Sequence, residues 1–394
     1  MKAIISAYAV RPYSGSEPGL GWQWVRGLAP LLDKALVITE SEFATEIKEW
    51  LEEEKIENIE FIFIPIGKLG RRLCWNQGNY LFYFFYRLWQ IRVYRYLRKQ
   101  NLHEYDYIHH LNMIGYREPG LLHLLQKPFV LGPLGGLNTV PRGFLLNSSL
   151  SARIKFEIKR SFNFISLRMP YVKAALRNSS LVLSANSESF YKLKEIGFDS
   201  VLFNETGLEI KQKGDETLRR KKRILWVGKM VQRKLPLLAL DIFADLLKHD
   251  NDITITFLGD GPELLMLKNR IVDYGIESRV EVKGKVQRST VLELMENSLC
   301  LLFTSIDEGT PHVVLEALSS GMYVFTHDSC GMKDIIEDSS FKVVPVDYDT
   351  SRREFTDKIL KFISNSDPKD LPDIERYSWQ NKFKQFIELV KSKL

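Results

Sequence analysis

Two glutamates enclose the short segment Glu308-Gly-Thr-Pro-His-Val-Val-Leu-Glu316. With this spacing, the segment could bind an anion through its backbone and hydroxyl groups through the two carboxylates. The apolar run 299–304 before it predicts a buried strand, and the residues from Val313 predict a helix after a turn at Gly309-Thr-Pro311. Glu308 then lies at the carboxyl end of the strand, and Glu316 about one turn into the helix. A helix N-terminus binds anions, and ligands of open α/β sheets bind at carboxyl strand ends. The alternative is one loop carboxylate and one solvated helix carboxylate.

A basic loop follows the first strand expected in the second half of the chain, in the segment 227–236. Gly228 lets the backbone turn, and Lys229, Arg233 and Lys234 place cations beside the N-terminus of the next helix. Cations and a helix N-terminus together suit a diphosphate, although a solvated basic loop is the alternative. With the two glutamates, this loop predicts a nucleotide-diphosphate site.

The N-terminal segment predicts a strand over 2–9, a glycine-rich loop over 13–21 and a helix over 22–32. The loop lacks the third glycine and the spacing of a dinucleotide fingerprint, which disfavours NAD and FAD. It offers close backbone approach at a helix N-terminus, or it is a plain β-to-α turn. The segment 259–262 also fails the fingerprint, so we expect no cofactor.

Strands alternate with helices along the chain, which is typical of parallel, doubly wound sheets. The pattern restarts after the polar stretch 211–222, and 394 residues suit two cores. We predict an α/β protein with two doubly wound, Rossmann-like domains facing across a cleft. Residues 1–205 form the N-terminal domain and 206–376 the C-terminal domain. The helix over 377–394 packs back toward the N-terminal domain.

The composition, with 45% hydrophobic and 26% charged residues, is typical of a soluble globular protein. Three widely spaced cysteines, Cys74, Cys300 and Cys330, argue against a disulfide framework and a structural zinc site. The N-terminus runs directly into a strand, so we expect no signal peptide and a cytoplasmic location. We interpret the D-x-D motif Asp347-Tyr-Asp349 as surface, and expect no metal because cations already balance the phosphate charge.

The net charge of +6 is concentrated in the first 200 residues. The aromatic, basic stretch 79–96 has no acidic residue, and 141–180 holds eight basic residues and one acidic residue. The stretch 79–96 is too short in unbroken apolar length to span a bilayer. The regions 71–99 and 141–177 are predicted to lie near an anionic membrane surface. The alternative for 79–96 is a core helix with snorkelling arginines.

The ordered set of segments resembles the GT4 family of retaining glycosyltransferases, which have the GT-B fold. The resemblance covers nearly the whole chain. In the second half it is carried by 228–234, 259–262, 282–286, 308–316 and 377–379, and in the first half by 15–21, 109–119 and 132–136.

The resemblance implies that Lys229 and Lys234 neutralise the donor diphosphate. The family usually has arginine at the first position, so Lys229 keeps the charge but loses bidentate geometry. Glu316 would accept hydrogen bonds from the ribose, and Glu308 would contact hydroxyls of the donor sugar. The other donor-binding positions implied are Gly15, Gly19, Gly21, Gly228, Arg233, Gly284, Val286, Gly309, Thr310, His312 and Val313.

A histidine pair, His109 and His110, ends a strand of the first domain, and the family often has a histidine lining the reaction centre there. Alternation makes the two face opposite sides of the sheet, and the spacing from Asp106 favours His109 as the catalytic one. The alternative is a buried histidine bonded to backbone. The acceptor positions implied are His110, Asn112, Gly135 and Gly136.

The resemblance implies transfer of a sugar from a nucleotide-diphosphate donor, with retention and without a dedicated nucleophile. The acceptor would be a saccharide or lipid-linked saccharide, in bacterial cell-surface polysaccharide synthesis at the inner face of the cytoplasmic membrane. One alternative is a nucleic-acid-binding protein, although no RNA or DNA motif is present. Others are a non-catalytic nucleotide-sugar-binding homologue and a sugar phosphorylase, which would need a pyridoxal phosphate lysine.

Overall fold

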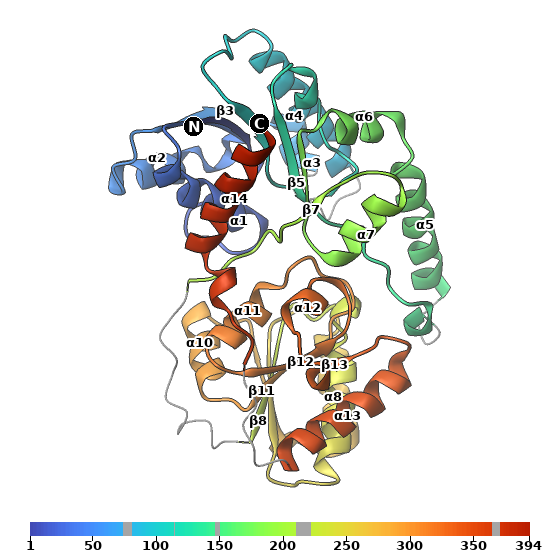
Figure 1. Cartoon of the computed structure of the whole chain (residues 1–394). Helices are drawn as coiled ribbons and strands as arrows, with labels where there is room; N and C mark the ends of the chain where they lie inside the picture. The colour runs from blue at the N-terminus through green and yellow to red at the C-terminus, as the bar shows by residue number, and fades with distance from the viewer. Residues whose placement is uncertain (74–80, 114, 146–149, 210–221, 365–370) are drawn as a thin grey trace. The chain divides into compact units, whose positions relative to one another are not determined.

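The computed structural model describes residues 1–394 apart from 74–80, 114, 146–149, 210–221 and 365–370 (Figure 1). The chain forms two compact units. Unit 1 comprises Met1–Leu137, Glu157–Glu205 and Trp379–Leu394, and unit 2 comprises Asn138–Phe156 and Thr206–Ser378. Cys74, the start of the aromatic stretch 79–96 and most of the polar stretch 211–222 lie outside the described residues.

Unit 1 is built on a seven-stranded parallel sheet with the order β3-β2-β1-β4-β5-β6-β7. Parallel strands are covered on both faces, so their sequences are nearly continuous apolar runs. The strands are β1 (Lys2–Ser6), β2 (Lys34–Thr39), β3 (Ile59–Phe63), β4 (Tyr107–His110), β5 (Phe129–Leu134), β6 (Leu181–Ser184) and β7 (Val201–Leu202).

Helices cover both faces of this sheet, which gives unit 1 two apolar cores. Ile4 contributes to one core and its neighbour Ile5 to the other, because successive strand residues point to opposite faces. The helices of unit 1 are α1 (Ser16–Leu28), α2 (Ala44–Glu53), α3 (Lys68–Leu73), α4 (Phe82–Leu97), α6 (Pro170–Asn178), α7 (Ser187–Glu195) and α14 (Trp379–Lys393). Helix α5 (Leu150–Ser166) contributes its second half to the same unit.

The prediction that 15–21 is a loop is wrong, because α1 begins at Ser16 and has Gly15 as its N-cap. Gly19 and Gly21 therefore lie within the helix. A Cβ at Gly19 would stand 1.9 Å from the carbonyl oxygen of Ser14, and one at Gly21 would stand 2.2 Å from that of Ala9. These glycines let the first turns of α1 press against the preceding loop.

Helix α4 covers most of the aromatic stretch 79–96, and one of its faces lies in the core, as the alternative interpretation had it. Seven of its residues are buried, and the indole of Trp89 donates to the carbonyl of Ile64 at 2.7 Å. The guanidinium of Arg87 lies 4.4 Å from the ring centre of Tyr171 and pairs with Glu118 at 3.0 Å. The arginines of α4 therefore extend from a helix whose apolar face is already covered.

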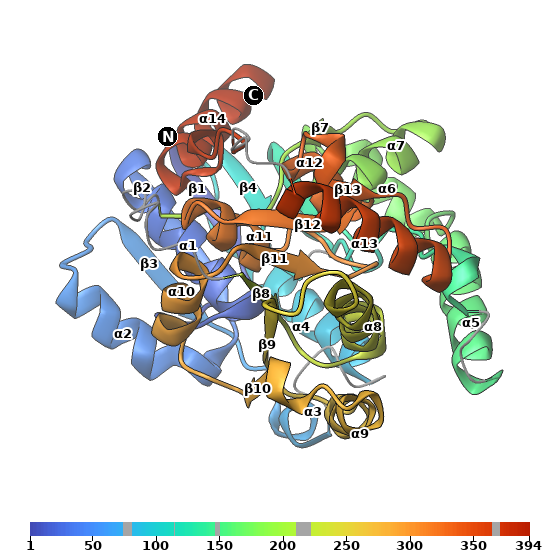
Figure 2. The ribbon, with the colours of Figure 1, turned by 90° about the horizontal axis from the view of Figure 1, so that it is seen from below.

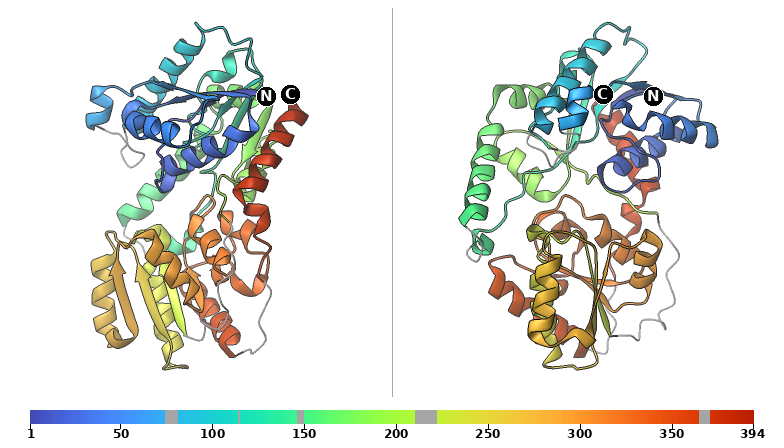
Figure 3. Two further views of the ribbon diagram at one scale, coloured as in Figure 1. Left: turned by 90° about the vertical axis from the view of Figure 1, so that its left-hand side faces the viewer. Right: turned by 180° about the vertical axis from the view of Figure 1, so that it is seen from behind.

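The last helix, α14, packs on unit 1 beside α1 (Figure 3). Trp24 of α1 meets the rings of Phe383 and Phe386 edge-on at 5.5 and 5.2 Å. A Cβ at Gly27 would stand 1.8 Å from the ring of Phe383. The close packing of the two helices thus depends on a glycine opposite a phenylalanine.

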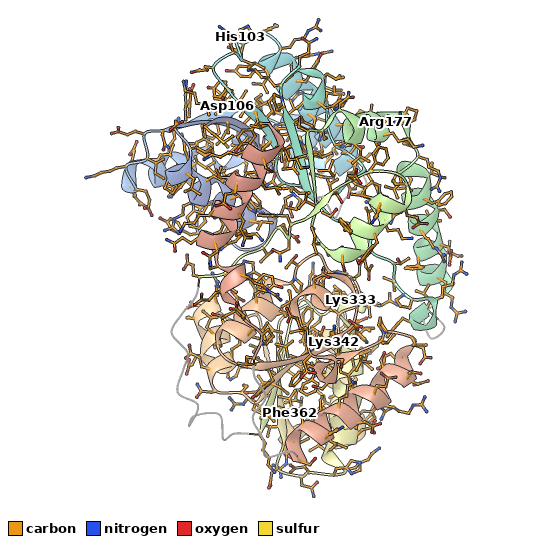
Figure 4. All side chains as sticks on the ribbon, viewed as in Figure 1. His103, Asp106, Arg177, Lys333, Lys342 and Phe362 are labelled. Carbon is orange, nitrogen blue, oxygen red and sulfur yellow. The ribbon has the colours of Figure 1, made fainter. Side chains whose placement is uncertain are left out.

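Unit 2 contains a six-stranded parallel sheet with the order β10-β9-β8-β11-β12-β13 (Figure 2). Its strands are β8 (Arg223–Val227), β9 (Thr254–Leu258), β10 (Val280–Gly284), β11 (Cys300–Phe303), β12 (Tyr323–His327) and β13 (Lys342–Val343). Its helices are α8 (Pro236–Leu247), α9 (Leu264–Tyr274), α10 (Arg288–Glu296), α11 (His312–Ser319), α12 (Cys330–Ile335) and α13 (Tyr348–Ser364). Ring contacts join Phe362 of α13, labelled in Figure 4, to the β12 residues Tyr323 and Phe325.

Residues 138–156, expected in the N-terminal domain, pack with unit 2. The amide of Asn138 donates to the backbone carbonyl of Glu308 at 2.7 Å. A Cβ at Gly143 would stand 2.2 Å from the carbonyl oxygen of Val346. Two close approaches to backbone therefore hold this segment. No helix in the described ranges is long and apolar enough to cross a membrane.

Candidate functional site

The predicted diphosphate site lies where the strand order of unit 2 reverses. From β8 the chain proceeds outward to β9 and β10, and then returns to place β11 on the other side of β8. The loops after β8 and β11 consequently leave the sheet in adjacent positions, and ligands of open α/β sheets bind at such a switch point. The first loop carries Lys229, Arg233 and Lys234, and the second carries Glu308.

The centre of the site is an ion cluster around the carboxylate of Glu308. Its Oε1 lies 2.8 Å from Nζ of Lys234 and 2.7 Å from a guanidinium nitrogen of Arg233. The hydroxyl of Ser305 also donates to Oε1, at 2.7 Å. The side chains of Glu308 and Lys234 are each 13% exposed, whereas Arg233 is 47% exposed. The structure thus brings these three predicted residues together.

Lys234 is positioned by its surroundings as well as by its charge. Its ammonium lies 5.0 Å from the ring centre of Phe303, the last residue of β11. A Cβ at Gly228 would stand 2.9 Å from Cδ of Lys234, so this glycine leaves the space that the lysine stem occupies. Thr304 donates its hydroxyl toward the carbonyls of Lys234 and Leu235, at 2.8 and 2.9 Å. The cation is therefore fixed before any ligand arrives.

Glycines hold the two loops at close range. Gly259 has φ of +130°, and a Cβ there would stand 1.8 Å from the carbonyl oxygen of Gly228. A Cβ at Gly331, in α12, would stand 1.8 Å from the carbonyl oxygen of Gly309. Thr206 donates to the carbonyl of Thr310 at 3.3 Å. These contacts fix the backbone of both loops.

Glu316 lies on α11 as predicted, and its carboxylate is held by an arginine that sequence analysis did not single out. Arg288, the first residue of α10, donates from Nε at 2.9 Å and pairs through a terminal nitrogen at 2.6 Å, both to Oε1. His312 stands 3.9 Å from the same oxygen. Glu316 is 16% exposed and Arg288 is 71% exposed, so the arginine covers Glu316 from the solvent side.

The remaining predicted donor positions of unit 2 lie in or directly beside the loops at the same edge of the sheet. Lys229 is exposed in the loop after β8. Gly284 ends β10 with φ of +65° and accepts a hydrogen bond from the amide of Gly259 at 2.7 Å, and Val286 is half-buried just beyond it. Val313 is half-buried in the first turn of α11.

The predicted positions of unit 1 include two buried histidines. His109 donates from Nε2 to the carbonyl of Gly132 at 2.7 Å and stacks on Phe386, and burial lowers its pKa to about 3. His110 points to the other face of the sheet, with Nε2 at 3.2 Å from the hydroxyl of Tyr86, and burial lowers its pKa to about 4. The expected opposition of the two is thus confirmed. The surroundings of His109 match the alternative interpretation of this residue, which is a buried histidine hydrogen-bonded to the backbone.

The other residues of unit 1 predicted to contact acceptor or donor support the backbone. Asn112 donates to the carbonyl of Ala9 at 2.5 Å, directly beside Gly21. Gly135 forms an isolated bridge with Gly115, and Gly136 is exposed with φ of +79°. In this structure these residues join the loops that follow β1, β4 and β5.

Two parts of the unit 2 site escaped sequence analysis because they depend on distant residues. Asn138 and Arg288 reach Glu308 and Glu316 from outside the motifs, and no spacing rule links them. Ser305 follows directly after the predicted strand 299–304. Its position at the carboxyl end of that strand could have identified it as a site residue. Among the described residues, no group of three or more His, Cys, Asp and Glu side chains gathers where it could hold a metal ion.

Similar proteins agree with this arrangement. Residues 209–380 match the family model for Glycosyl transferases group 1. The chain is 23% identical over 164 residues to a phosphatidylinositol N-acetylglucosaminyltransferase subunit of Arabidopsis thaliana, covering 41% of this chain and 36% of that protein. It is 28% identical over 140 residues to alpha-monoglucosyldiacylglycerol synthase of Streptococcus pneumoniae, covering 34% and 32%. The matches span about a third of these relatives' length.

Solved structures match over the whole chain. Anabaena Alr3699/HepE, crystallised in complex with UDP and glucose, matches with a TM-score of 0.62 at 17% identity, covering 100% of both chains. The lipopolysaccharide outer core galactosyltransferase WaaB matches with a TM-score of 0.63 at 18% identity, also covering 100% of both. The two parallel-sheet units thus define a GT-B fold. Residues 209–380 are thus similar to the glycosyl transferases group 1, and the resemblance to glycosyltransferases of the GT-B fold found in the sequence is confirmed.

Proposed function

We propose that the chain transfers a sugar from a nucleotide-diphosphate donor to an acceptor hydroxyl, with retention at the anomeric carbon. The observation that carries the proposal is the cluster of Lys234, Arg233 and Glu308 at the switch point of unit 2. It combines fixed cations for a diphosphate with a carboxylate for sugar hydroxyls. The relatives named above include enzymes that transfer sugars, and HepE was crystallised with UDP and glucose.

In this proposal Lys234 and Arg233 balance the diphosphate, with Lys229 adding a third cation from the exposed side of the loop. Glu308 gives up part of its contact with the cations and accepts hydrogen bonds from the donor sugar. Glu316 accepts hydrogen bonds from the ribose, and Arg288 yields one carboxylate oxygen to them. The backbone of 309–313 closes around the sugar and phosphates.

The chemical step breaks the bond between the anomeric carbon and the diphosphate oxygen, and forms a bond from that carbon to the acceptor oxygen. The acceptor attacks the face that the diphosphate leaves, and its proton passes to a diphosphate oxygen. The cations stabilise the charge that develops on the leaving group, and the fixed loops position the reactants. No metal is required in this account. Proton NMR of the first-formed product tests retention, since an inverted anomeric proton coupling would contradict it.

We propose a saccharide or lipid-linked saccharide as the acceptor, in bacterial cell-surface polysaccharide synthesis at the cytoplasmic face of the membrane. The named relatives supporting this direction are enzymes whose names refer to lipid acceptors or to the lipopolysaccharide outer core. The basic character of the first 200 residues agrees with work beside an anionic surface.

The proposal is tested by thermal stabilisation with UDP, GDP, ADP, CMP and NAD. At a concentration about a hundred times Kd, a ligand adds about 2.7 kcal/mol, which is roughly 5–10 °C for a domain of this size. We expect one nucleoside diphosphate to stabilise the wild type selectively. Glu316→Gln should lose that shift, whereas the control Glu296→Gln, exposed on α10, should keep it. Binding of RNA without any nucleotide shift would favour the nucleic-acid alternative.

A further inference from the structure

A buried histidine, His327, ends β12 beside the loop that carries Glu308. In the register of the two parallel strands, Phe303 of β11 pairs with Thr326 of β12. His327 therefore lies next to the point where the chain after β11 leaves the sheet. Its side chain is fully buried. Because buried polar groups are hydrogen-bonded, the partners of the ring show which parts of the unit it holds.

The hydrogen bonds of the ring define its tautomer. Nδ1 of His327 lies 3.3 Å from the carbonyl oxygen of Ser305, and Nε2 lies 3.1 Å from the hydroxyl of Ser351 in α13. Burial lowers the pKa of His327 to about 4, so near pH 7 the ring is neutral and carries one N–H proton. A carbonyl oxygen can only accept a hydrogen bond, so this proton is on Nδ1, and Nε2 accepts from Ser351. His327 therefore donates to the backbone of Ser305.

The surroundings of the imidazole keep it in this orientation. The rings of Phe144 and Phe355 meet it edge-on, with ring centres 5.5 and 5.0 Å from that of His327. Ser351 is also fully buried, and its backbone amide donates to the carbonyl of Asp347 at 3.1 Å. The imidazole cannot turn without losing its packing and both hydrogen bonds. The N–H that faces Ser305 is therefore held in one position.

Ser305 connects this ring to the ion cluster. Its carbonyl accepts from His327, and its hydroxyl donates to Oε1 of Glu308 at 2.7 Å. The same carboxylate oxygen pairs with Lys234 at 2.8 Å. A shift of the Ser305 backbone would move its hydroxyl, and with it the carboxylate of Glu308. The orientation of this carboxylate thus depends on a side chain that lies outside the cluster.

We propose that His327 is a positioning residue for sugar transfer, which holds Ser305 and through it the carboxylate of Glu308 in the orientation that receives the donor sugar. The inference rests on the proposed function, because Glu308 is assigned there to the sugar hydroxyls. It adds that the rate of transfer depends on the hydrogen bond from Nδ1, whereas binding of the diphosphate depends on the cations. The alternative is a histidine that only fills the core between β12 and α13, whose replacement would change stability alone.

Two substitutions of the histidine separate these roles. His327→Asn places an amide donor where Nδ1 was, whereas His327→Gln places its amide near Nε2, toward Ser351. We expect kcat of His327→Asn to stay within about threefold of the wild type and kcat of His327→Gln to fall about tenfold or more, because small displacements of a positioned group slow the chemical step. Asparagine leaves the larger cavity, so His327→Asn should be the less stable of the two in urea. The expected order of activity is thus opposite to the order of stability.

Transfer is measured by steady-state kinetics with the UDP-, GDP- or ADP-sugar that the wild type turns over, and Kd by calorimetry with the matching diphosphate. Kd should change by less than about threefold in both variants, which also shows that unit 2 is folded. The milder change Ser351→Ala should lower kcat about twofold to fivefold. The matched control is Tyr348→Phe, which removes a hydrogen bond of 2.7 Å to Asp241 in the same unit. It should lower stability and change kcat by less than about twofold.

The results of these assays distinguish the inference from the proposed function. Equal kcat values for His327→Asn and His327→Gln, or values that follow the order of stability, would overturn the inference while the proposed function stands. A weaker Kd with unchanged kcat would overturn it as well, since the effect would then be on the diphosphate. A wild type that turns over none of the nucleotide sugars would overturn the proposed function, and this inference with it.

Discussion

Replacing Glu308 by glutamine should tighten binding of the nucleoside diphosphate while it slows sugar transfer. Glu308 is the counterion of Lys234 and Arg233. When the diphosphate binds, both cations must interact with it as well, which weakens their attraction to Glu308. Glutamine keeps the shape and accepts the hydrogen bond from Ser305, but it no longer competes for the cations. The change therefore separates charge from geometry.

The expected gain in diphosphate affinity follows from the contacts of Oε1 of Glu308. At 2.8 Å and an effective dielectric constant of about 20, the gross attraction to Lys234 is about 6 kcal/mol. Desolvation and side-chain ordering cancel most of it, which leaves about 1–2 kcal/mol. The pair with Arg233 adds less than about 1 kcal/mol, because that guanidinium is half-exposed. We therefore expect binding about five- to thirtyfold tighter.

Isothermal titration calorimetry with the nucleoside diphosphate that stabilises the wild type measures this difference. Asp307→Asn is the matched control, since it removes a neighbouring carboxylate that is not the counterion of Lys234. We expect it to change Kd by less than about twofold. The rate of transfer by Glu308→Gln should fall about a hundredfold or more, because contacts to the sugar hydroxyls weaken. Unchanged or weaker diphosphate binding in Glu308→Gln would refute the reasoning.

Three further results are expected. Lys234→Gln should lower kcat/KM about tenfold to a hundredfold through loss of one charge-assisted contact, measured by steady-state kinetics. Gly259→Ala should destabilise by about 2–4 kcal/mol in urea unfolding, because its Cβ meets the backbone of Gly228, whereas Gly275→Ala, with open space around it, should cost about 1 kcal/mol. Stability should fall as the pH drops from about 6.5 toward 4, by about 2 kcal/mol for each buried histidine at pH 5. Burial lowers the folded pKa of these side chains, so the unfolded state binds more protons in that window; they are His109, His110 and His327. A melting temperature independent of pH over this range would contradict the last prediction.

Much of the fold follows from local pattern. The alternation of apolar runs with amphipathic stretches predicted two parallel sheets, and the strand before Glu308 and the helix that holds Glu316 lie where they were expected. The start of α1 was placed wrongly because glycines read as loop residues. Gly19 and Gly21 are needed because the helix packs closely against the backbone carbonyls of Ser14 and Ala9. Helix propensity, which depends on local sequence, cannot predict such a tertiary contact.

The site was predictable in its motif residues and not in its partners. Lys234 and Glu308 lie in recognisable segments, and their approach follows from the strand order. The pairing of Arg288 with Glu316 joins residues from separate elements, and only the fold sets their distance. For the aromatic stretch 79–96 the sequence left both a core helix and an interfacial helix open, because the two share a composition. The burial of its side chains, which only the fold determines, favours the core helix.

The most direct test of the account is release of nucleoside diphosphate from UDP-, GDP- and ADP-sugars by the wild type and by Lys234→Gln. We expect the wild type to release one of the three diphosphates, faster when a saccharide or lipid-linked acceptor is added, and Lys234→Gln to release it at least about tenfold more slowly. No release from any nucleotide sugar, or equal rates for the two proteins, would contradict the claim that this cluster holds the leaving group.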